Sequence, residues 1–340
     1  MSEDIRGGHV VCFGEVLLRL TAVGNGGLLQ HPSLDAHFGG AEANVAIALA
    51  RMGTPSSMVS ALPEGQLGDA AIEQFRRHAV NVSAIRRTPG RLGLYYFIAG
   101  IGHRASTVLY DRQFSTFAAL KPGMIDWNAV LDGAAWLHMS GITPALGPDS
   151  AALALEAAQA ARAAGVRLSF DGNYRARLWE TWSHHPEESL RPIVDEADLL
   201  FGNHRDATLL LGRSFEGHTP DARRAAADAL FERFPRLQWI ASTARDVIDA
   251  ETNSITGRLD GRERGWETDS VAIGRIIDRI GTGDAFAAGL LHGLMTGAPQ
   301  DAIQTAVALA VLKHYVPGDA SNVTSHDVAA FLSGQRDVRR

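Results

Sequence analysis

The chain has 340 residues, 46% of them hydrophobic, which is enough to bury the core of one large α/β domain or of two ordinary ones. A formal net charge of −6 argues against nucleic-acid binding, and no apolar stretch reaches the length of a membrane span. The single cysteine, Cys12, excludes a disulfide framework, and its apolar surroundings predict a buried, inert thiol.

The first six residues are polar and acidic and do not resemble a secretory leader, so we expect a cytoplasmic protein. After them, short apolar runs alternate with amphipathic patterns. The predicted buried strands are Val10–Phe13, Ser57–Ala61, Trp136–Met139, Val166–Phe170, Leu199–Phe201 and Trp239–Ser242. The predicted helices are Ser150–Ala164, Pro220–Phe234, Asp284–Thr296 and Asp301–Tyr315. This alternation indicates an α/β fold with a mostly parallel sheet covered by helices on both faces.

Two segments break the alternation. Residues 28–38 and 91–111 hold strand-forming side chains with no helix between the strands. They predict a small antiparallel β-sheet inserted after the first strands. The alternative is an ordinary edge hairpin.

A glycine pair, Gly39-Gly40, comes directly before a helical pattern whose apolar positions recur at helical spacing. Paired glycines allow a ligand to approach the backbone closely, and Asn44, about one turn into the helix, offers a polyol both a donor and an acceptor. The alternative is a tight strand-to-helix turn with Asn44 on a solvated face.

A second glycine turn, Gly281-Thr282-Gly283-Asp284, opens a helix near the C-terminus. Backbone amides freed by the glycines, together with the positive end of the helix dipole, can hold a transferring phosphoryl group. Asp284 can then accept the proton of an attacking hydroxyl. The alternative is that Thr282 or Asp284 only caps the helix.

Together these two turns resemble the two signature motifs of the ribokinase-like (PfkB) carbohydrate kinases, and the resemblance runs from about Val10 to Leu332. Shorter stretches look like the 2-keto-3-deoxygluconate kinases within that family: Gly93–Tyr95, Val108–Arg112, Ser140–Leu146, Phe170–Arg175 and Leu312–His314. The resemblance implies one ribokinase-like domain over residues 1–340, with the small sheet as a lid over the sugar. In the family such lids often pair, which implies a homodimer or a higher homo-oligomer.

Two arginines favour a sugar acid as the substrate. A guanidinium can grip a carboxylate with two hydrogen bonds, whereas a neutral sugar needs mainly Asp, Asn and backbone partners. Arg112 falls on the predicted lid, and Arg175 follows a core strand at its carboxyl end, where open α/β sheets place ligands. Both match positions that hold the substrate acid in the resembled kinases, as do Tyr95 and Tyr110. The alternative for the arginines is a surface salt bridge, and for the tyrosines a lid residue with an exposed tip.

The nucleotide side departs further from the family. Asn203 and Asp206 resemble an N-x-x-E motif that orders Mg²⁺ and the phosphates through water, with Asp in place of Glu, and Asn203 can also cap a helix. Ser242 begins a segment, Ser242–Asp246, in which relatives often carry a Lys and a Gly-rich turn. His314 matches a region beside the adenine, although a lone helical His is more often a packing residue. The glycine turn itself is preceded by Asp278-Arg279-Ile280, where the family usually reads D-T-x.

The resemblance therefore implies an ATP- and Mg²⁺-dependent kinase for the terminal hydroxyl of 2-keto-3-deoxygluconate or a close keto-deoxy sugar acid. It leaves open a monovalent cation, the nucleotide preference, and the gluconate- or galactonate-derived epimer. One alternative is a kinase for a neutral sugar such as fructose or ribose. Another is a non-catalytic sugar-binding protein on the same fold.

Overall fold

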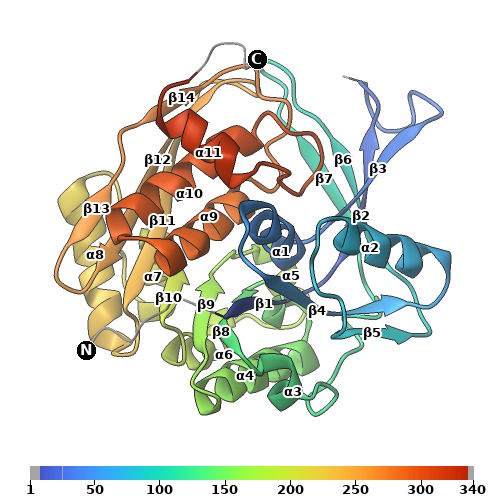
Figure 1. Ribbon diagram of the computed structural model, residues 1–340, viewed down its shortest axis with the longest axis horizontal. Helices are drawn as coiled ribbons and strands as arrows, with labels where there is room; N and C mark the ends of the chain where they lie inside the picture. Colours follow the sequence, from blue (N-terminus) through green and yellow to red (C-terminus); the bar gives the residue numbers. More distant parts are fainter. Residues whose placement is uncertain (1–7, 25, 336–340) are drawn as a thin grey trace.

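A long, mostly parallel β-sheet forms the centre of the molecule. The computed structural model describes residues 8–24 and 26–335, so the polar start of the chain, Met1–Arg6, lies outside the described residues. The strands in spatial order are β13 (Gly265–Glu267), β12 (Asn253–Gly261), β11 (Trp239–Val247), β10 (Leu199–Phe201), β9 (Arg167–Asp171), β8 (Ala134–Ser140), β1 (His9–Phe13), β4 (Ser56–Pro63) and β5 (Ile85–Thr88), with β14 (Val271–Ile273) paired to β12 (Figure 1). From β11 to β5 every pair is parallel, whereas β12 pairs antiparallel with β11, β13 and β14.

Helices cover both faces of this sheet, as the alternation predicts. One face carries α1 (Ala41–Met52), α2 (Gln66–Arg77), α9 (Thr282–Thr296), α10 (Pro299–Lys313) and α11 (Ser325–Leu332). The other face carries α3 (Trp127–Leu131), the 3₁₀ turn η1 (Pro144–Leu146), α4 (Pro148–Ala163), α5 (Ala176–Trp179), α6 (Pro186–Asp195), α7 (His204–Leu211) and α8 (Pro220–Arg233). Within the described residues, no helix combines the length and the apolar character needed to cross a membrane.

Strand β1 shows why a continuous apolar run becomes a central strand. Its side chains alternate between the two faces, with Val10 and Cys12 in the core beneath α1 and Val11 and Phe13 in the core beneath α4. All four are fully buried. Cys12 is a free, buried thiol, as expected, and burial raises its pKa well above the usual value.

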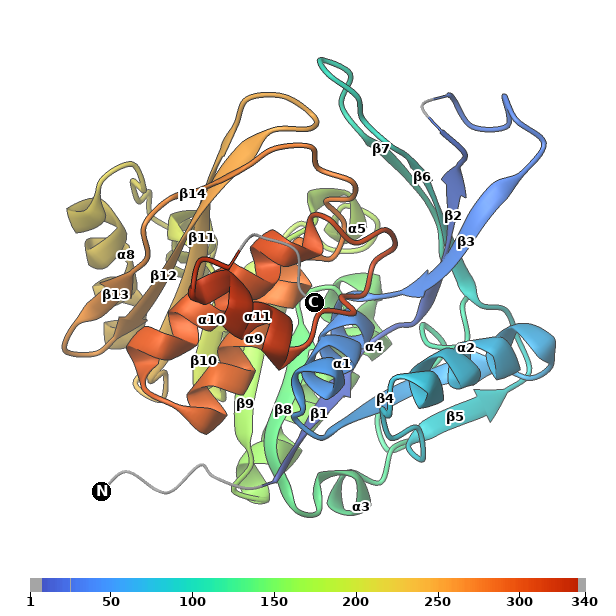
Figure 2. The same ribbon diagram turned by 45° about the horizontal axis from the view of Figure 1, so that its top comes forward.

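A second, smaller sheet rises from one end of the main sheet (Figure 2). Its order is β3 (Leu34–Gly39), β2 (Leu17–Ala22), β6 (Gly93–Ile98) and β7 (Thr107–Asp111). The outer pairs β2–β3 and β6–β7 are antiparallel, as expected, but β2 pairs parallel with β6. The predicted segment 28–38 is a strand only from Leu34, and β2 was not predicted. Only three residues, Gly14–Val16, separate β2 from β1, so the two strands resemble one apolar run.

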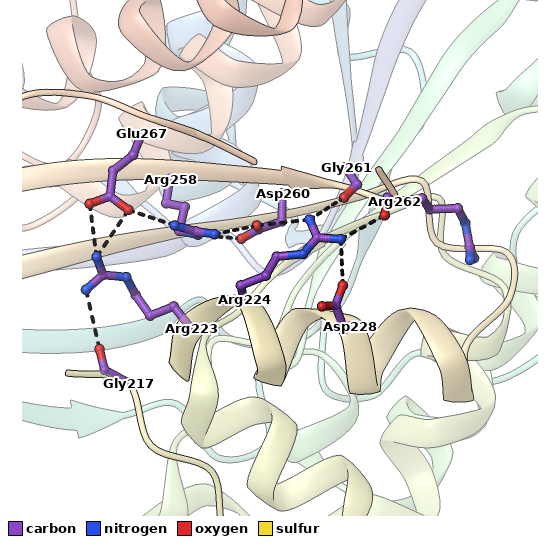
Figure 3. Close-up of polar contacts among 9 residues, drawn as sticks. All are labelled: Gly217, Arg223, Arg224, Asp228, Arg258, Asp260, Gly261, Arg262 and Glu267. Atoms are coloured by element: carbon purple, nitrogen blue, oxygen red, sulfur yellow. Dashed lines mark hydrogen bonds and ion pairs between the residues drawn. The ribbon is translucent and has the colours of Figure 1, made fainter. Parts of the chain in front are cut away.

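A network of charges fixes the antiparallel edge of the main sheet to α8 (Figure 3). Arg258 on β12 donates two hydrogen bonds to the buried Asp260, at 2.7 and 2.8 Å, and a third to Glu267 on β13 at 2.9 Å. Arg223 and Arg224 of α8 reach Glu267 and Asp260, respectively. Because several charges share partners in fixed geometry, this network contributes more than an isolated surface ion pair would. It holds α8 beside Ser242 of β11, and Arg223, Asp260 and Ser242 line one small pocket.

Candidate functional site

A cavity lies where the small sheet faces the start of α9, at the carboxyl end of β9. Open α/β sheets bind ligands at this end of their strands. Its polar lining comes from β7 and its end, α1, the β9–α5 connection and the turn before α9: Tyr110, Arg112, Asn44, Asp171, Asn173, Arg175, Arg279, Gly281, Thr282, Gly283 and Asp284, with Glu15, Gly40, Glu42, Tyr95, Arg245 and Asp319 around them. The cavity therefore gathers most of the residues predicted to bind the sugar and to catalyse the reaction.

The two glycine turns meet through one hydrogen bond, because Asn44 Nδ2 donates to Asp284 Oδ2 at 2.6 Å across 240 residues of sequence. Asn44 is buried rather than on a solvated face, and its Oδ1 is buried without a hydrogen-bond partner. Such an orphaned acceptor suits a ligand hydroxyl. Gly40 allows the turn before α1 to pass close to the chain at Glu15, since its φ is +136° and a Cβ there would overlap the Glu15 carbonyl oxygen.

The start of α9 is open to an anion. Gly281 is its N-cap, with φ at +80°, and no side chain caps the helix, so the capping alternative for Thr282 and Asp284 does not describe this turn. The Thr282 hydroxyl instead donates to the Arg279 carbonyl at 3.0 Å. Amide groups at an uncapped helix start carry partial positive charge and favour phosphate. Asp284 lies in the first turn, beside them.

Three carboxyl groups in the cavity wall resist ionisation. Burial raises the pKa of Asp284 to about 7, and the charges of Glu42 and Asp319 add to the effect, while the Asn44 hydrogen bond opposes it. Burial likewise raises the pKa of Glu42 and of Asp171 to about 7. The three groups act on one another, so they titrate as a cluster, and such perturbed values are typical of catalytic sites.

This cluster predicts a pH dependence. A general base must be deprotonated, so kcat/KM should rise with pH through about 7 and level off above it. Glu42→Gln removes a negative charge that raises the pKa of Asp284, so the rising limb should shift to lower pH. Glu73→Gln on the exposed face of α2 is the control. A limb at the same pH in both variants would contradict Asp284 as the titrating base.

Arg112 and the tyrosines line the cavity on the side of the small sheet. Arg112 is buried and already paired: its Nε donates to Glu15 Oε2 at 2.8 Å, and its Nη2 donates to the same oxygen. The Tyr95 hydroxyl donates to Asp319, and its ring lies 5.7 Å from that of Tyr110, which is 53% exposed. Arg112 therefore contacts a ligand carboxylate only by sharing its donors with Glu15.

The guanidinium of Arg175 has fewer protein partners than that of Arg112. Its Nη1 donates to the Tyr174 carbonyl at 3.1 Å, and no carboxylate of the described residues lies within ion-pair distance of it. It is exposed and lines the cavity together with Asp171 and Asn173, and its charge opposes the raised pKa of Asp171 and of Asp284. An anionic group in the cavity could therefore pair with Arg175 without breaking an ion pair within the protein.

A second cavity adjoins the first and shares with it Asp171, Asn173, Arg175 and Gly283. The predicted nucleotide residues Asn203, Asp206 and Ser242 line it. Asn203 also caps α7: its side chain accepts from the Arg205 amide at 2.8 Å, and Asp206 accepts from the Asn203 amide at 2.8 Å. Both interpretations of Asn203 are thus compatible with one conformation.

The same cavity suits a hydrated divalent cation. Among the described residues no group of three or more Asp, Glu, His or Cys side chains forms a metal cage. However, Mg²⁺ needs only one or two carboxylates beside phosphate and water. Asp171 and Asp206 both line this cavity, and burial raises the pKa of each, a penalty that a nearby cation would relieve.

Two predicted residues do not line either cavity. His314 is fully buried, with Nδ1 next to the Ala310 carbonyl and Nε2 next to Asn253, and burial lowers its pKa to about 4. This environment fits the packing alternative. Gly39 ends β3, and a Cβ there would overlap the Asp319 side chain, so it supports the cavity rather than facing it.

The sequence patterns missed a buried ion network behind the cavity. Arg19 of β2 bridges Asp278 and Asp319, at 2.8 Å each, and thereby ties the small sheet to the turn before α9. Its signal was present, since a charged residue inside an apolar strand must find buried partners. Arg245 and Arg279, where the sequence departs from the family motifs, were also not predicted to face the cavity.

Comparison with known proteins gives a consistent result. The family model described as pfkB family carbohydrate kinase matches residues 8–325. The 2-dehydro-3-deoxygalactonokinase of Haloferax volcanii is 31% identical over 96% of this chain and 97% of its own length, and the 2-dehydro-3-deoxygluconokinase of Bacillus subtilis is 27% identical over 97% of each. The crystal structure of 2-dehydro-3-deoxygluconokinase from Thermotoga maritima superposes with a TM-score of 0.90 at 35% identity, covering 96% of this chain and 100% of that one.

Proposed function

Because the chain belongs to the pfkB family of carbohydrate kinases, we propose that it transfers a phosphoryl group from ATP to the terminal hydroxyl of 2-keto-3-deoxygluconate or a close keto-deoxy sugar acid. The observation that carries this substrate class is the unpaired guanidinium of Arg175, which lines the same cavity as the Asn44–Asp284 pair. A substrate carboxylate would gain a charged hydrogen-bond partner in Arg175, whereas a neutral sugar would not.

The role of each residue follows from its position in the cavity. Asp284 accepts the proton of the attacking hydroxyl, while Asn44 orients its carboxylate and presents a free acceptor to the sugar. The Gly281–Gly283 turn and the amides of α9 hold the phosphoryl group. Arg175 and Arg112 bind the carboxylate, and Tyr95 and Tyr110 enclose the sugar from the small sheet.

We assign the nucleotide to the second cavity, lined by Asn203, Asp206 and Ser242. Mg²⁺ would be held by Asp206 through water and by Asp171, and when bound it neutralises phosphate charge. The shared wall at Gly283 brings the two cavities together where the phosphoryl group must pass. His314, just after the end of α10, is buried and supports the turn before α9, because its carbonyl accepts from the Ile277 and Asp278 amides at 2.9 and 3.1 Å.

We further propose that residues 1–340 act as one kinase domain, in the cytoplasm, where ATP is available, with the small sheet as its lid.

The lid has open edges at β3 and β7, and Leu109 and Tyr110 on β7 are about half exposed. Unpaired edges need cover, which a second lid in a symmetric dimer supplies. Sedimentation should show a dimer, and a fully active monomer at micromolar concentration would contradict lid pairing.

Removing Arg175 tests the substrate class. Arg175→Ala should raise KM for the keto-deoxy acid at least tenfold, equivalent to about 1.4 kcal/mol or more, because the substrate carboxylate loses a charged partner. A neutral sugar of similar length should be handled no worse than by the parent enzyme. Steady-state kinetics with an ADP-coupled assay measures both.

The control is Arg177→Ala, which removes an exposed arginine from α5, the short helix that Arg175 precedes; Arg177 lines neither cavity. Arg112 requires a paired design because Arg112→Ala alone leaves Glu15 buried and unpaired. Arg112→Ala with Glu15→Gln should show the same loss specific to acids. Equal losses on acid and neutral sugars would instead assign the arginines to the lid or the phosphates.

A further inference from the structure

Two arginines beside the start of α9 have no role in the assignments above. Arg245 lies on β11, and its Nη2 donates to the Thr282 hydroxyl at 3.2 Å. Arg279 lies in the turn before α9, and its Nη2 donates to the Asp249 carbonyl. Both side chains line the cavity that holds Asp284. They come from separate segments, yet they face the same uncapped helix start.

Neither guanidinium forms an ion pair with a described residue, although burial lowers the pKa of Arg279 and the charge of Asp249 opposes that effect. No carboxylate of the described residues lies within ion-pair distance of Arg245 or Arg279, in contrast to Arg19 and Arg112, which are both paired. Arg245 is exposed as a whole residue, yet partial burial of its guanidinium and the charge of Arg279 lower its pKa. The Nε of Arg279 is also buried without a hydrogen-bond partner. Two unpaired guanidinium groups so placed favour an anion between them.

The position of Thr282 decides which anion this is. Thr282 comes two residues before Asp284, whose carboxylate receives the proton of the attacking hydroxyl. A guanidinium bonded to Thr282 therefore stands at the hydroxyl end of the sugar, whereas Arg112 and the Tyr110 ring stand on the lid side. The anion that passes the hydroxyl end is the phosphoryl group on its way from the nucleotide.

We propose that Arg245 and Arg279 are catalytic residues that contact the γ-phosphoryl group during transfer and stabilise the charge on its oxygens. In this step the sugar oxygen forms a bond to the γ-phosphorus as the bond to the bridging oxygen breaks. ADP leaves with that electron pair, and the hydroxyl proton passes to Asp284. The two guanidinium groups complement the α9 amides, in a segment that lacks the Gly-rich turn of many relatives.

The inference rests on the proposed kinase activity, and its test separates the two. Arg245→Gln and Arg279→Gln should each lower kcat by about 10²-fold or more, the scale for losing one donor to a transition-state anion, while the Kd for ADP changes less than about threefold. Arg264→Gln is the control, because Arg264 is exposed on the β12–β13 hairpin and stacks on Trp266 at 4.7 Å. Arg245→Lys keeps the positive charge but loses the planar guanidinium, so its kcat should lie between that of the parent and that of Arg245→Gln.

A second readout does not depend on turnover. Calorimetry should show that the parent binds Mg²⁺ and ADP more tightly when aluminium fluoride is present. Both glutamine variants should lose this gain in affinity. Unchanged kcat and an unchanged gain would overturn the proposal, as would a loss confined to the Kd of ADP. If the parent phosphorylates only neutral sugars, the substrate proposal fails, and the arginines are judged on that acceptor.

Discussion

Asp284→Asn is expected to lower kcat by about 10²–10⁴-fold, the usual scale for loss of a general base, while the fold and the binding of both substrates are kept. Asparagine has nearly the same shape and can still accept the hydrogen bond from Asn44, but it cannot take the proton of the sugar hydroxyl. Because burial already raises the pKa of Asp284 to about 7, the neutral amide should not destabilise the protein. Steady-state kinetics and thermal denaturation measure the two effects.

The chain provides a matched control in the next helix. Asp301 is the third residue of α10, as Asp284 is of α9, but it is exposed and lines neither cavity. Asp301→Asn should leave kcat unchanged. Turnover of Asp284→Asn close to that of the parent would remove Asp284 from the mechanism.

Gly281→Ala is the second change with a large expected effect. Gly281 has a φ of +80°, and a Cβ there would overlap the Asp319 carbonyl oxygen, so the turn must move. Movement displaces the amides at the start of α9, and loss of one such donor lowers kcat by about 10²–10³-fold. The variant should also melt at a lower temperature, because Asp319 is held by Arg19 and Tyr95 and cannot yield freely.

Gly274→Ala separates this effect from a general loss of glycine. Gly274 precedes the same turn, has no left-handed φ, and has open space where the methyl group of an alanine would stand. It should behave like the parent in both assays. If Gly281→Ala also kept parental kcat, the helix start would not be the phosphoryl site.

Much of the architecture could be predicted because its signals are local. The runs at Val10–Phe13 and Leu199–Phe201 are buried on both faces and therefore apolar throughout, and the helices between them repeat with helical spacing. Strand β2 was missed because its partners β3 and β6 are distant in sequence and its boundary with β1 carries no strong turn signal. The antiparallel edge β12–β14 was missed for a different reason, because polar residues and glycines interrupt the apolar pattern of β12.

Some residues of the candidate site could likewise be proposed from the sequence, and others could not. Asn44 and Asp284 were proposed from the sequence because each follows glycines in a recognisable motif, and the structure shows that the two turns meet through their hydrogen bond. The pairing of Arg112 with Glu15 could not, since it depends on how the small sheet packs over the strand end. Arg245 and Arg279 resemble ordinary surface arginines in the sequence, and only the folded structure shows that both line the cavity and that Arg245 contacts Thr282.

The most direct test of the proposed function is an ADP-release assay over a panel of sugar acids and neutral sugars, with Mg²⁺ and ATP. The account predicts that a keto-deoxy sugar acid, the gluconate-derived epimer or the galactonate-derived one, is used with a kcat/KM about 10²-fold or more above fructose and ribose, because only an acid pairs with the guanidinium of Arg175. A higher kcat/KM for a neutral sugar would contradict the substrate class, and sugar binding without any sugar-dependent ADP release would contradict catalysis itself.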